Sequence, residues 1–442
     1  MADQDRRIWV GNRRTVLRTI GASGVVGLAG CAGGGSGDSS GETTDGEAGG
    51  DSTETETDAG GETAGSSDGE TVKLGWLYPS TGPYGGLASY QEQGAKLGIK
   101  LINKNGGING MTVEGFHEDT QADPQTGKQK ARKLVQEDDV DALFGTISSS
   151  VGSAVAGYAE EENVPFYPDV AADGLTMDNC RRTTFRYETR ASQTAAAGAP
   201  WAVDNFGTKV WIHNADYLWG NSVASAWERV AKEHSSDVEV VGSTTSELGA
   251  TDFSSYISQI TSSDAEWVVT GLNGGDAVNF LKQANSYGLK SEKTLVSPVN
   301  AFQFIRKAAG EAAQNTYSAV RYYEGFDTEA NAEFVDAFSN EYDTAPDNFS
   351  HVSWVYLYLY KRAAEEAGSV AADDIIEAQT SVSFDGPMGE TSYRECDHQA
   401  ARPYSMGKIV APGDYEWPDI DVMTTISADE ATVPCSDVSC QF

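Results

Sequence analysis

Three consecutive serines, Ser148, Ser149 and Ser150, follow a short apolar segment that ends in Gly145. The segment after them repeats apolar side chains at helical spacing, so the serines lie where a buried strand passes into a helix. The start of a helix presents free backbone N–H groups and the positive end of its dipole, and serine hydroxyls add donors with little bulk. This arrangement predicts a site for a negatively charged or polar ligand. Simple N-capping of the helix by a serine is the alternative explanation.

Catalytic signatures are absent from the sequence. It carries no His-Glu-x-x-His motif, no Walker A loop and no Gly-x-Gly-x-x-Gly motif, and its five histidines are scattered. Asp119 and Asp123 lie close enough to form a carboxylate pair, but they flank the start of a predicted helix, where capping explains them. No two cysteines have the C-x-x-C spacing of a zinc site. We therefore predict a protein that is not an enzyme and uses no metal or other cofactor.

The composition is strongly acidic. Against 31 Lys and Arg residues stand 66 Asp and Glu residues, which gives a formal net charge of −35. Such a charge repels nucleic acid and anionic membrane surfaces and argues against both as partners. Acidic residues are spread along the whole chain, as in proteins whose charge repulsion is screened by high salt. We predict a halophilic protein, with an ordinary acidic soluble protein as the alternative.

The start of the chain predicts export rather than fold. Arg13 and Arg14 precede a weakly apolar stretch that is too short to span a bilayer and resembles a twin-arginine signal peptide. A Leu-Ala-Gly-Cys motif ending at Cys31 resembles a lipobox, in which this cysteine becomes the lipidated first residue. We predict a signal peptide over residues 1–30 and a disordered acidic tether over 31–70, which would hold the protein at the outer face of the cell membrane. An uncleaved membrane anchor is the alternative.

The remaining cysteines are Cys180, Cys396, Cys435 and Cys440. An even number of cysteines in an exported chain predicts two disulfides, for which three pairings are possible. We favour a small local ring between Cys435 and Cys440, which leaves Cys180 to pair with Cys396 across a long loop.

Strand and helix patterns alternate through the body of the chain, once over residues 71–170 and again from residue 208 to 298. A helical stretch, Asn348–Gly368, and a β-like segment follow. The alternation predicts an α/β protein with two Rossmann-like lobes, each built on a parallel sheet covered by helices. Ligands of such sheets bind beyond the carboxyl ends of the strands, so two facing lobes form a clamp that closes by hinge motion.

The segment INKNGGINGMTVEGFHEDTQADPQTGKQKARKLVQEDDVDALFGTISSS, residues 102–150, resembles the solute-binding proteins of branched-chain amino acid and amide ABC importers. The resemblance extends over about residues 72–425. Its later motifs are AADGLT at 171–176, FR at 185–186, ADYLWG at 215–220 and DHQ at 397–399.

The resemblance implies the type I periplasmic-binding fold, in which a three-crossing hinge joins two lobes. The implied boundaries are 71–188 with 325–386 for lobe one, 189–324 with 387–425 for lobe two, 426–442 for a C-terminal tail, and hinge crossings near 187–191, 321–325 and 384–390.

The resemblance also implies positions for the ligand-binding residues. In leucine/isoleucine/valine-binding proteins the matching serine loop holds the α-carboxylate of the ligand. Tyr84 lies on the loop after the first strand, where it would wall the pocket. Tyr217 and Trp219 follow the first strand of lobe two, where they would stack on the ligand. Asn273 matches a ligand-contacting position, and packing at the edge of a lobe is the alternative role for the aromatic residues.

The sequence departs from the amino-acid binders at two positions. Ala171 stands where those proteins place a threonine, and Asn300 lies in the loop where they place a glutamate that pairs with the α-ammonium. Unless Asp169 or Asp276 replaces that glutamate, the ammonium partner is missing. The ligand classes that remain open are branched-chain amino acids, amides, urea-like compounds and simple carboxylates.

We therefore expect an extracytoplasmic, lipid-anchored, monomeric protein that captures a small polar ligand and delivers it to an ABC permease. A surface sensor that presents its ligand-bound state to a membrane transducer is the alternative. Asn348 begins an Asn-Phe-Ser sequence, and whether it is glycosylated stays open.

Overall fold

The computed structural model describes residues 71–442. The predicted signal peptide, the tether and Cys31 lie outside the described residues. Within the described part of the chain, no helix is both long and apolar enough to cross a membrane.

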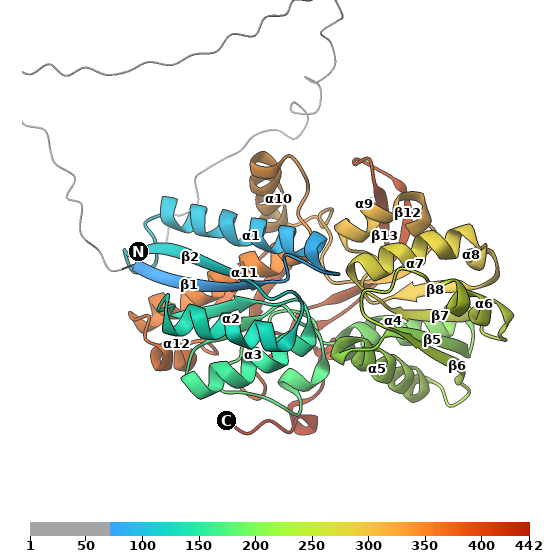
Figure 1. Ribbon diagram of the computed structural model, residues 1–442, viewed down its shortest axis with the longest axis horizontal. Helices are drawn as coiled ribbons and strands as arrows, with labels where there is room; N and C mark the ends of the chain where they lie inside the picture. The colour runs from blue at the N-terminus through green and yellow to red at the C-terminus, as the bar shows by residue number, and fades with distance from the viewer. Residues whose placement is uncertain (1–70) are drawn as a thin grey trace, which may run out of the picture. The chain divides into compact units, whose positions relative to one another are not determined.

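The first lobe is built on a four-stranded parallel sheet in the order β2-β1-β3-β4, and Figure 1 labels its strands β1 and β2 together with α1, α2 and α3. Val72, Leu74 and Trp76 of β1 enter a core shared with α1 and α11, whereas Leu77 packs in a second cluster with α2 and α3. Helices thus cover both faces of the sheet, which is why its strands are so apolar. The elements of this lobe are β1 (Thr71–Tyr78), α1 (Gly85–Lys104), β2 (Thr112–Asp119), α2 (Pro124–Gln136), β3 (Ala142–Gly145), α3 (Ser149–Glu162), β4 (Phe166–Pro168), η1 (Asp173–Thr176), α10 (Glu329–Tyr342), α11 (Asn348–Ala367), α12 (Ala372–Ala378), β10 (Ser383–Gly386) and β11 (Gly389–Ser392).

Asp119 and Asp123 have the structural roles expected for the start of a helix. Asp123 is the N-cap of α2, and its carboxylate accepts a hydrogen bond from the Thr126 N–H at 2.7 Å. Asp119 accepts hydrogen bonds from the Thr81 hydroxyl at 2.7 Å and from the Gln121 N–H at 2.9 Å. These bonds account for both carboxylates, so the pair carries no sign of acid–base chemistry.

The second lobe is built on a seven-stranded sheet in the order β13-β12-β9-β8-β7-β5-β6. Its strands from β5 to β9 are parallel, and β12 and β13 are added antiparallel at one edge. The two lobes confirm the predicted fold class. The elements of the second lobe are α4 (Ala191–Phe206), β5 (Lys209–Ala215), α5 (Leu218–His234), β6 (Glu239–Ser246), α6 (Ser254–Ser262), β7 (Trp267–Gly271), α7 (Gly274–Ser286), α8 (Leu289–Glu292), β8 (Thr294–Ser297), α9 (Gln303–Ala309), η2 (Gly310–Ala313), β9 (Tyr317–Val320), β12 (Tyr404–Pro412), β13 (Pro418–Ile426) and α13 (Ala428–Ala431).

Before the C-terminal tail, three segments of chain connect the lobes. The first contains Glu188 and precedes α4, and the second begins at Arg321 directly after β9. The third differs from the prediction, because residues 384–390 belong to the β10–β11 hairpin, which packs with α11 of the first lobe. The chain enters the second sheet only at Tyr404. We retain the other predicted lobe boundaries as a proposal and move the third crossing to residues 393–403.

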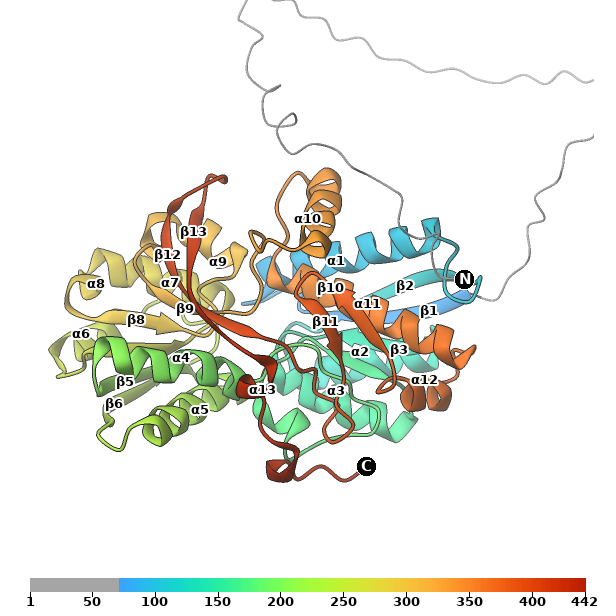
Figure 2. The same ribbon diagram turned by 180° about the vertical axis from the view of Figure 1, so that it is seen from behind.

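The disulfides join Cys180 to Cys440 and Cys396 to Cys435, with Cα–Cα distances of 5.4 and 5.9 Å. The predicted pairing was therefore wrong, although the same four cysteines are bonded. After α13 the chain turns back toward the first lobe, as Figure 2 shows, so the tail meets cysteines that lie far away in sequence.

Hydrogen bonds hold the tail in this path. The Ser439 N–H donates to the Met177 carbonyl at 3.1 Å, which brings Cys440 beside Cys180. Arg394 donates from Nη1 to the Val433 carbonyl at 2.7 Å. These two long-range contacts place each tail cysteine beside a distant cysteine, so Cys435 and Cys440 do not bond to each other. The spacing of the cysteines in the sequence did not reveal these contacts.

Candidate ligand-binding site

The loops at the carboxyl ends of the strands of the two lobes meet. The Gly275 N–H, at the start of α7, donates a hydrogen bond to the Pro83 carbonyl at 3.3 Å. Gly274 has a φ of +57°, and a Cβ there would lie 2.8 Å from the same carbonyl oxygen, so glycine allows this approach. Next to the contact, the rings of Tyr84 and Tyr217 lie 6.3 Å apart between centroids. The two edges at which ligands are expected therefore face each other.

A tight turn presents the serine loop at this edge. Gly145 ends β3 with a φ of +98°, and a Cβ there would lie 2.7 Å from the Leu77 carbonyl oxygen of the neighbouring strand. Thr146 follows with a φ of +60°. A glycine at the end of the strand lets the chain turn directly into α3, which places the serines at the carboxyl end of the sheet.

The three hydroxyls of the serine loop have different surroundings. Ser149 Oγ accepts hydrogen bonds from the N–H groups of Ala171 at 3.3 Å and Ala172 at 3.1 Å, so it ties α3 to the loop after β4. Ser148 is the N-cap residue of α3, yet its buried Oγ has no hydrogen-bond partner within residues 71–442. Ser150 is half-buried. Ser148, rather than Ser149, is therefore the hydroxyl left free for a ligand.

The three predicted aromatic residues lie together. Tyr84 comes from the first lobe, and Tyr217 and Trp219 come from the loop and first turn of α5 in the second, with 6.0 Å between the last two ring centroids. Burial raises the pKa of the Tyr84 and Tyr217 hydroxyls well above their ordinary range, so both remain protonated donors. Neither Tyr84 Oη nor Trp219 Nε1 has a hydrogen-bond partner in the described part of the chain, although both are buried.

Of the two predicted asparagines, one is hydrogen-bonded within the protein and the other has a free donor. Asn273 is the N-cap of α7, and its side-chain oxygen accepts a hydrogen bond from the Gly274 N–H at 2.8 Å. Asn300 is 1% exposed, and its Nδ2 has no partner among the described residues. Asn273 therefore has a structural explanation, whereas Asn300 keeps an unused donor.

The two predicted substitutes for the ammonium-pairing glutamate are both buried carboxyl groups with raised pKa values. Asp169 accepts hydrogen bonds from Gln91 and from Ser353, and burial raises its pKa well above its ordinary range. Asp276 accepts a hydrogen bond from the Gly249 N–H at 3.0 Å, and burial raises its pKa to about 6. Desolvation thus favours the neutral form of Asp169, whereas Asp276 remains mostly ionised at neutral pH and its carboxylate already accepts the Gly249 N–H.

The sequence analysis missed a buried charged cluster at the crossings between the lobes. Glu188 Oε1 accepts a hydrogen bond from Nη1 of Arg321 at 3.2 Å and lies 4.0 Å from Nη2 of Arg402. Asn348 donates to the other oxygen of Glu188 at 2.7 Å, and its side chain is buried, so this residue does not present a surface glycosylation site. A charged residue directly after the buried strand β9, at a predicted hinge crossing, was the signal that could have identified Arg321.

A family profile described as "Periplasmic binding protein" matches residues 71–414, which is most of the chain. The chain belongs to the periplasmic binding protein family. Among its relatives is the Leu/Ile/Val-binding protein homolog 4 of Brucella abortus, 25% identical over 359 residues, 77% of this chain and 84% of the relative. The leucine-, isoleucine-, valine-, threonine- and alanine-binding protein of Pseudomonas aeruginosa is 23% identical over 329 residues, 74% of this chain and 86% of the relative.

Crystal structures of periplasmic binding proteins have the same fold. One from Burkholderia mallei has a TM-score of 0.78 at 23% identity and covers 84% of this chain and 98% of its own. A solute-binding protein of an ABC transporter from R. palustris, in complex with benzoate, has a TM-score of 0.76 at 22% identity and covers 84% of this chain and 100% of its own.

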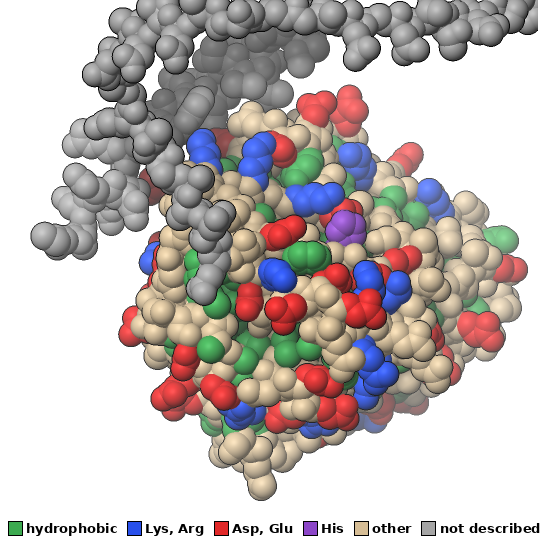
Figure 3. All heavy atoms as spheres, turned by 60° about the vertical axis from the view of Figure 1, so that its left-hand side comes forward, with side chains coloured by type: hydrophobic (Ala, Val, Ile, Leu, Met, Phe, Trp, Pro, Cys, Tyr) green, Lys and Arg blue, Asp and Glu red, His purple; other side chains and the backbone are tan. Residues whose placement is uncertain are grey.

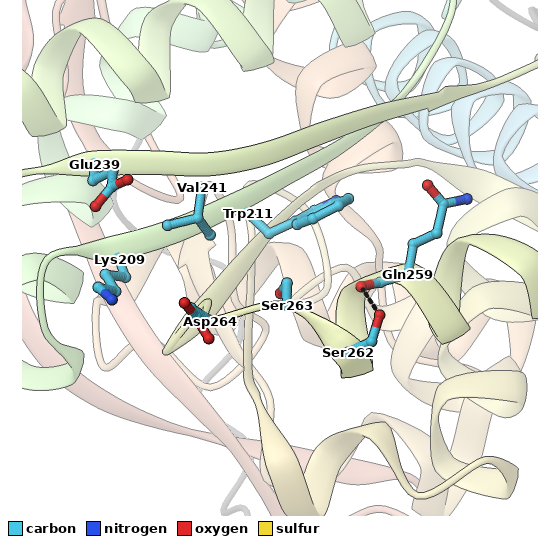
Figure 4. A pocket seen from close by; sticks show the side chains of 8 residues that line it. All are labelled: Lys209, Trp211, Glu239, Val241, Gln259, Ser262, Ser263 and Asp264. Carbon is cyan, nitrogen blue, oxygen red and sulfur yellow. Dashed lines mark hydrogen bonds between the residues drawn. The ribbon is translucent and has the colours of Figure 1, made fainter.

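A surface hollow of this periplasmic binding protein lies away from the site. It is lined by Lys209, Trp211, Glu239, Val241, Gln259, Ser262, Ser263 and Asp264 (Figure 4). Lys209 and Glu239 are the first residues of β5 and β6, so the hollow opens at the amino ends of these strands, opposite the edge that meets the first lobe. It is therefore separate from the candidate site. Likewise, no group of three or more potential metal ligands occurs within the described residues.

Charges of both signs are mixed on the surface of the first lobe. Figure 3 shows Lys and Arg side chains interspersed with Asp and Glu on the face that it draws. This face therefore carries no continuous basic area of the kind that binds nucleic acid.

Proposed function

We propose that this periplasmic binding protein captures a small polar solute between its lobes and delivers it to an ABC importer. The observation that carries the proposal is a group of buried donors without partners in residues 71–442, where the lobes meet: Tyr84 Oη, Ser148 Oγ, Trp219 Nε1 and Asn300 Nδ2. Each buried donor left without an acceptor costs about 1–3 kcal/mol. A ligand that supplies acceptors removes this cost, and closure of the lobes around it then becomes favourable.

The names of relatives support the solute class in general terms. The relative from Pseudomonas aeruginosa is named for five amino acids, and the neighbour from R. palustris was crystallised with benzoate. The solute that we propose is accordingly a small organic molecule with at least one strong hydrogen-bond acceptor and an apolar part that packs against Tyr217 and Trp219.

A thermal-shift screen of amino acids, amides and organic acids in molar KCl tests capture. A solute at 100-fold excess over its Kd stabilises the protein by about 2.7 kcal/mol. Replacing Trp219 by Ala should reduce the shift, and replacing the distant Trp211 by Phe, as a matched control, should leave it unchanged. Uptake of a labelled solute by cells with and without the gene tests delivery, and unchanged uptake would refute the role in import.

We also propose that Cys31 anchors the protein at the outer face of the membrane after twin-arginine export. The proposal is supported by the sequence, in which Arg13 and Arg14 precede an apolar stretch that ends at Cys31. Cys31→Ser should release the protein from the membrane fraction, and replacing both arginines by lysine should block export. A Cys31→Ser protein that stays with the membrane would contradict the lipoprotein assignment. Because one acyl chain binds only marginally, stable anchoring requires a second lipid or another contact.

A further inference from the structure

We propose that the solute is a carboxylate without an ammonium group, and that Arg321 binds its carboxylate through Nε and Nη2. This inference rests on the proposed function and names the chemical class of its ligand. It begins from one buried side chain at the second crossing between the lobes, which the residue patterns did not single out as a ligand-binding group.

The guanidinium of Arg321 is buried but only partly bonded. The residue is 2% exposed, and its Nη1 donates to Glu188. Nε and Nη2 have no hydrogen-bond partner anywhere in residues 71–442. These two N–H groups lie on the same edge of the planar guanidinium, which is the edge that binds the two oxygens of a carboxylate side by side.

Aromatic rings from two segments of the second lobe lie against this guanidinium. The centre of the Trp219 ring is 5.8 Å from Arg321 Cζ, and the centre of the Phe302 ring is 5.5 Å away. Trp219 follows β5, and Phe302 follows β8, so both rings come from the edge of the sheet that faces the first lobe. Ring faces attract the cation but accept little from its N–H edge, so they leave that edge available to a ligand.

Two other buried arginines, Arg306 and Arg402, have no such unused edge, whereas Nε and Nη2 of Arg190 also lack hydrogen-bond partners within residues 71–442, with Nη2 3.3 Å from the Asp397 carboxylate. Arg306 donates from Nε to the Ala301 carbonyl, from Nη1 to the Pro418 carbonyl, and from Nη2 to both oxygens of Glu324. In Arg402, Nε, Nη1 and Nη2 all donate to oxygen atoms of the protein. What distinguishes Arg321 is the position of its unused edge beside Trp219 and Phe302, at the edge of the second sheet that faces the first lobe.

The charge around Arg321 requires another anion. Arg321 and Arg402 share the single carboxylate of Glu188, at 3.2 and 4.0 Å. The nearby Asp169 favours its neutral form, and the ring of His351 is buried beside Tyr187, which lowers the pKa of the imidazole and keeps it neutral. Two buried guanidinium groups thus share one ionised carboxylate, and a bound anion beside Arg321 would lower the cost of burying the second charge.

The balance of charges around Arg321 also disfavours a ligand with an ammonium group. Glu188, the one ionised carboxylate of this cluster, already accepts hydrogen bonds from Arg321, Asn348 and the Thr189 N–H. An ammonium bound beside Arg321 would lie near two guanidinium groups, and the carboxylate of Asp276 already accepts the Gly249 N–H. A monocarboxylate supplies one negative charge and two coplanar acceptors, which match the one excess charge and the two free donors.

The test compares ligands that differ only in these groups. The probes are 4-methylpentanoate, 4-methylpentanamide and leucine, which share one carbon skeleton, together with benzoate and benzamide because the neighbouring side chains are aromatic. Calorimetry on the wild-type protein in molar KCl measures each affinity. At least one carboxylate should bind about tenfold or more tightly than its amide, and 4-methylpentanoate should bind more tightly than leucine.

Two substitutions assign the preference to Arg321. Arg321→Gln should abolish the preference for carboxylate over amide, and Arg321→Lys should retain a reduced preference because the charge stays while the paired donors are lost. Arg306→Lys, at an equally buried arginine outside the site, should keep the wild-type preference. Circular dichroism establishes that each variant is folded, and the wild-type comparison stands even where a variant does not fold.

Three results would overturn the inference. These are an amide or leucine that binds as tightly as its carboxylate, a wild-type protein that binds none of the probes, and an Arg321→Gln protein that keeps the full preference. Binding of leucine or an amide would leave the proposed solute capture intact while refuting the ligand class. The uptake assay tests the transport role independently of these probes.

Discussion

Glu188 and Arg321 form a buried ion pair of 3.2 Å between two different segments that cross from one lobe to the other. The Glu188 side chain also accepts hydrogen bonds from Asn348 at the start of α11 and from the Thr189 N–H. One carboxylate therefore fixes the relative position of two crossings and of a long helix of the first lobe. The residues that join the lobes and the residues that would hold the ligand are part of the same cluster.

Glu188→Gln should strongly destabilise the protein, because it leaves the guanidinium groups of Arg321 and Arg402 buried without a carboxylate. Breaking a buried pair by removing one partner costs about 3–5 kcal/mol. Urea denaturation followed by circular dichroism measures this loss. The control is Glu161→Gln, whose side chain is 66% exposed and pairs with Lys128 at 3.4 Å, and which should change stability by less than about 1 kcal/mol. Equal effects of the two substitutions would contradict the role assigned to Glu188.

Ser148→Ala and Ser149→Ala should have different effects. Ser149→Ala removes the acceptor of the Ala171 and Ala172 N–H groups and should lower the stability of the ligand-free protein by about 1–3 kcal/mol. Ser148→Ala removes an unused hydroxyl, so it should leave that stability nearly unchanged and weaken solute binding by about 0.5–1.5 kcal/mol. Thermal melts without solute and calorimetry with it separate the two effects. A Ser148→Ala protein with wild-type affinity would mean that this serine only begins the helix.

Loss of the disulfide between Cys180 and Cys440 should destabilise the fold. A disulfide typically contributes about 2–4 kcal/mol, and the contribution grows with the length of the closed loop, which spans 260 residues here. The Cys180→Ser/Cys440→Ser double variant avoids an unpaired thiol and should melt at a lower temperature than the wild type. Peptide mapping without reduction checks the pairing directly, and a fragment that joins Cys435 to Cys440 would contradict it.

Asp347 should make stability depend on pH in the acid range. Its carboxylate caps α11 and accepts hydrogen bonds from the N–H groups of Phe304 and Phe349, but burial raises its pKa to about 6 from 3.8. The folded protein therefore binds this proton more tightly than the unfolded chain, so the contribution of Asp347 falls as the pH rises from about 4 to about 6.

The comparison of wild type with Asp347→Asn isolates this contribution, because the other acids titrate alike in both proteins. The stability advantage of the wild type should be larger at pH 4 than at pH 7, by up to about 3 kcal/mol. Urea denaturation across this range measures the difference. An advantage that grows with pH would show that the carboxylate is stabilised, not destabilised, by its buried surroundings.

The net charge of −35 should make stability rise with salt concentration. The Debye length falls from about 10 Å at 0.1 M to about 3 Å at 1 M, so repulsion among the acidic side chains is screened. The melting temperature should climb steeply from 0.1 M toward molar KCl, and replacing KCl by sucrose of equal osmolality should reproduce little of the increase. A melting temperature that is flat over this range would refute halophilic adaptation.

Local patterns predicted much of the fold. The strands from β1 to β4 and the helices between them follow from apolar runs, helical spacing, and caps such as Asp123-Pro124. The edge at which we expect a ligand followed from the same alternation, and Tyr84, Tyr217 and Trp219 lie together there. Spacing along one element carries this information, because each position depends on residues only a few places away.

Long-range contacts explain what the residues did not reveal. The cysteine pairing depends on the path of the tail past Met177, and the bonding of Ser149 depends on the loop at Ala171. The unused edge of Arg321 is a further case, because it depends on which acceptors the fold leaves within reach. A sequence identifies an arginine, but only the packed structure shows that two of its donors have nothing to bind.

The bond between Cys180 and Cys440 also orders the events of biosynthesis. A nascent chain that has not yet reached residue 440 can form both sheets, since every strand from β1 to β13 ends before Ser427. It cannot form this bond, however complete its lobes have become. The bond therefore closes last, and it ties the end of the chain to the first lobe only after every strand of both sheets has been made.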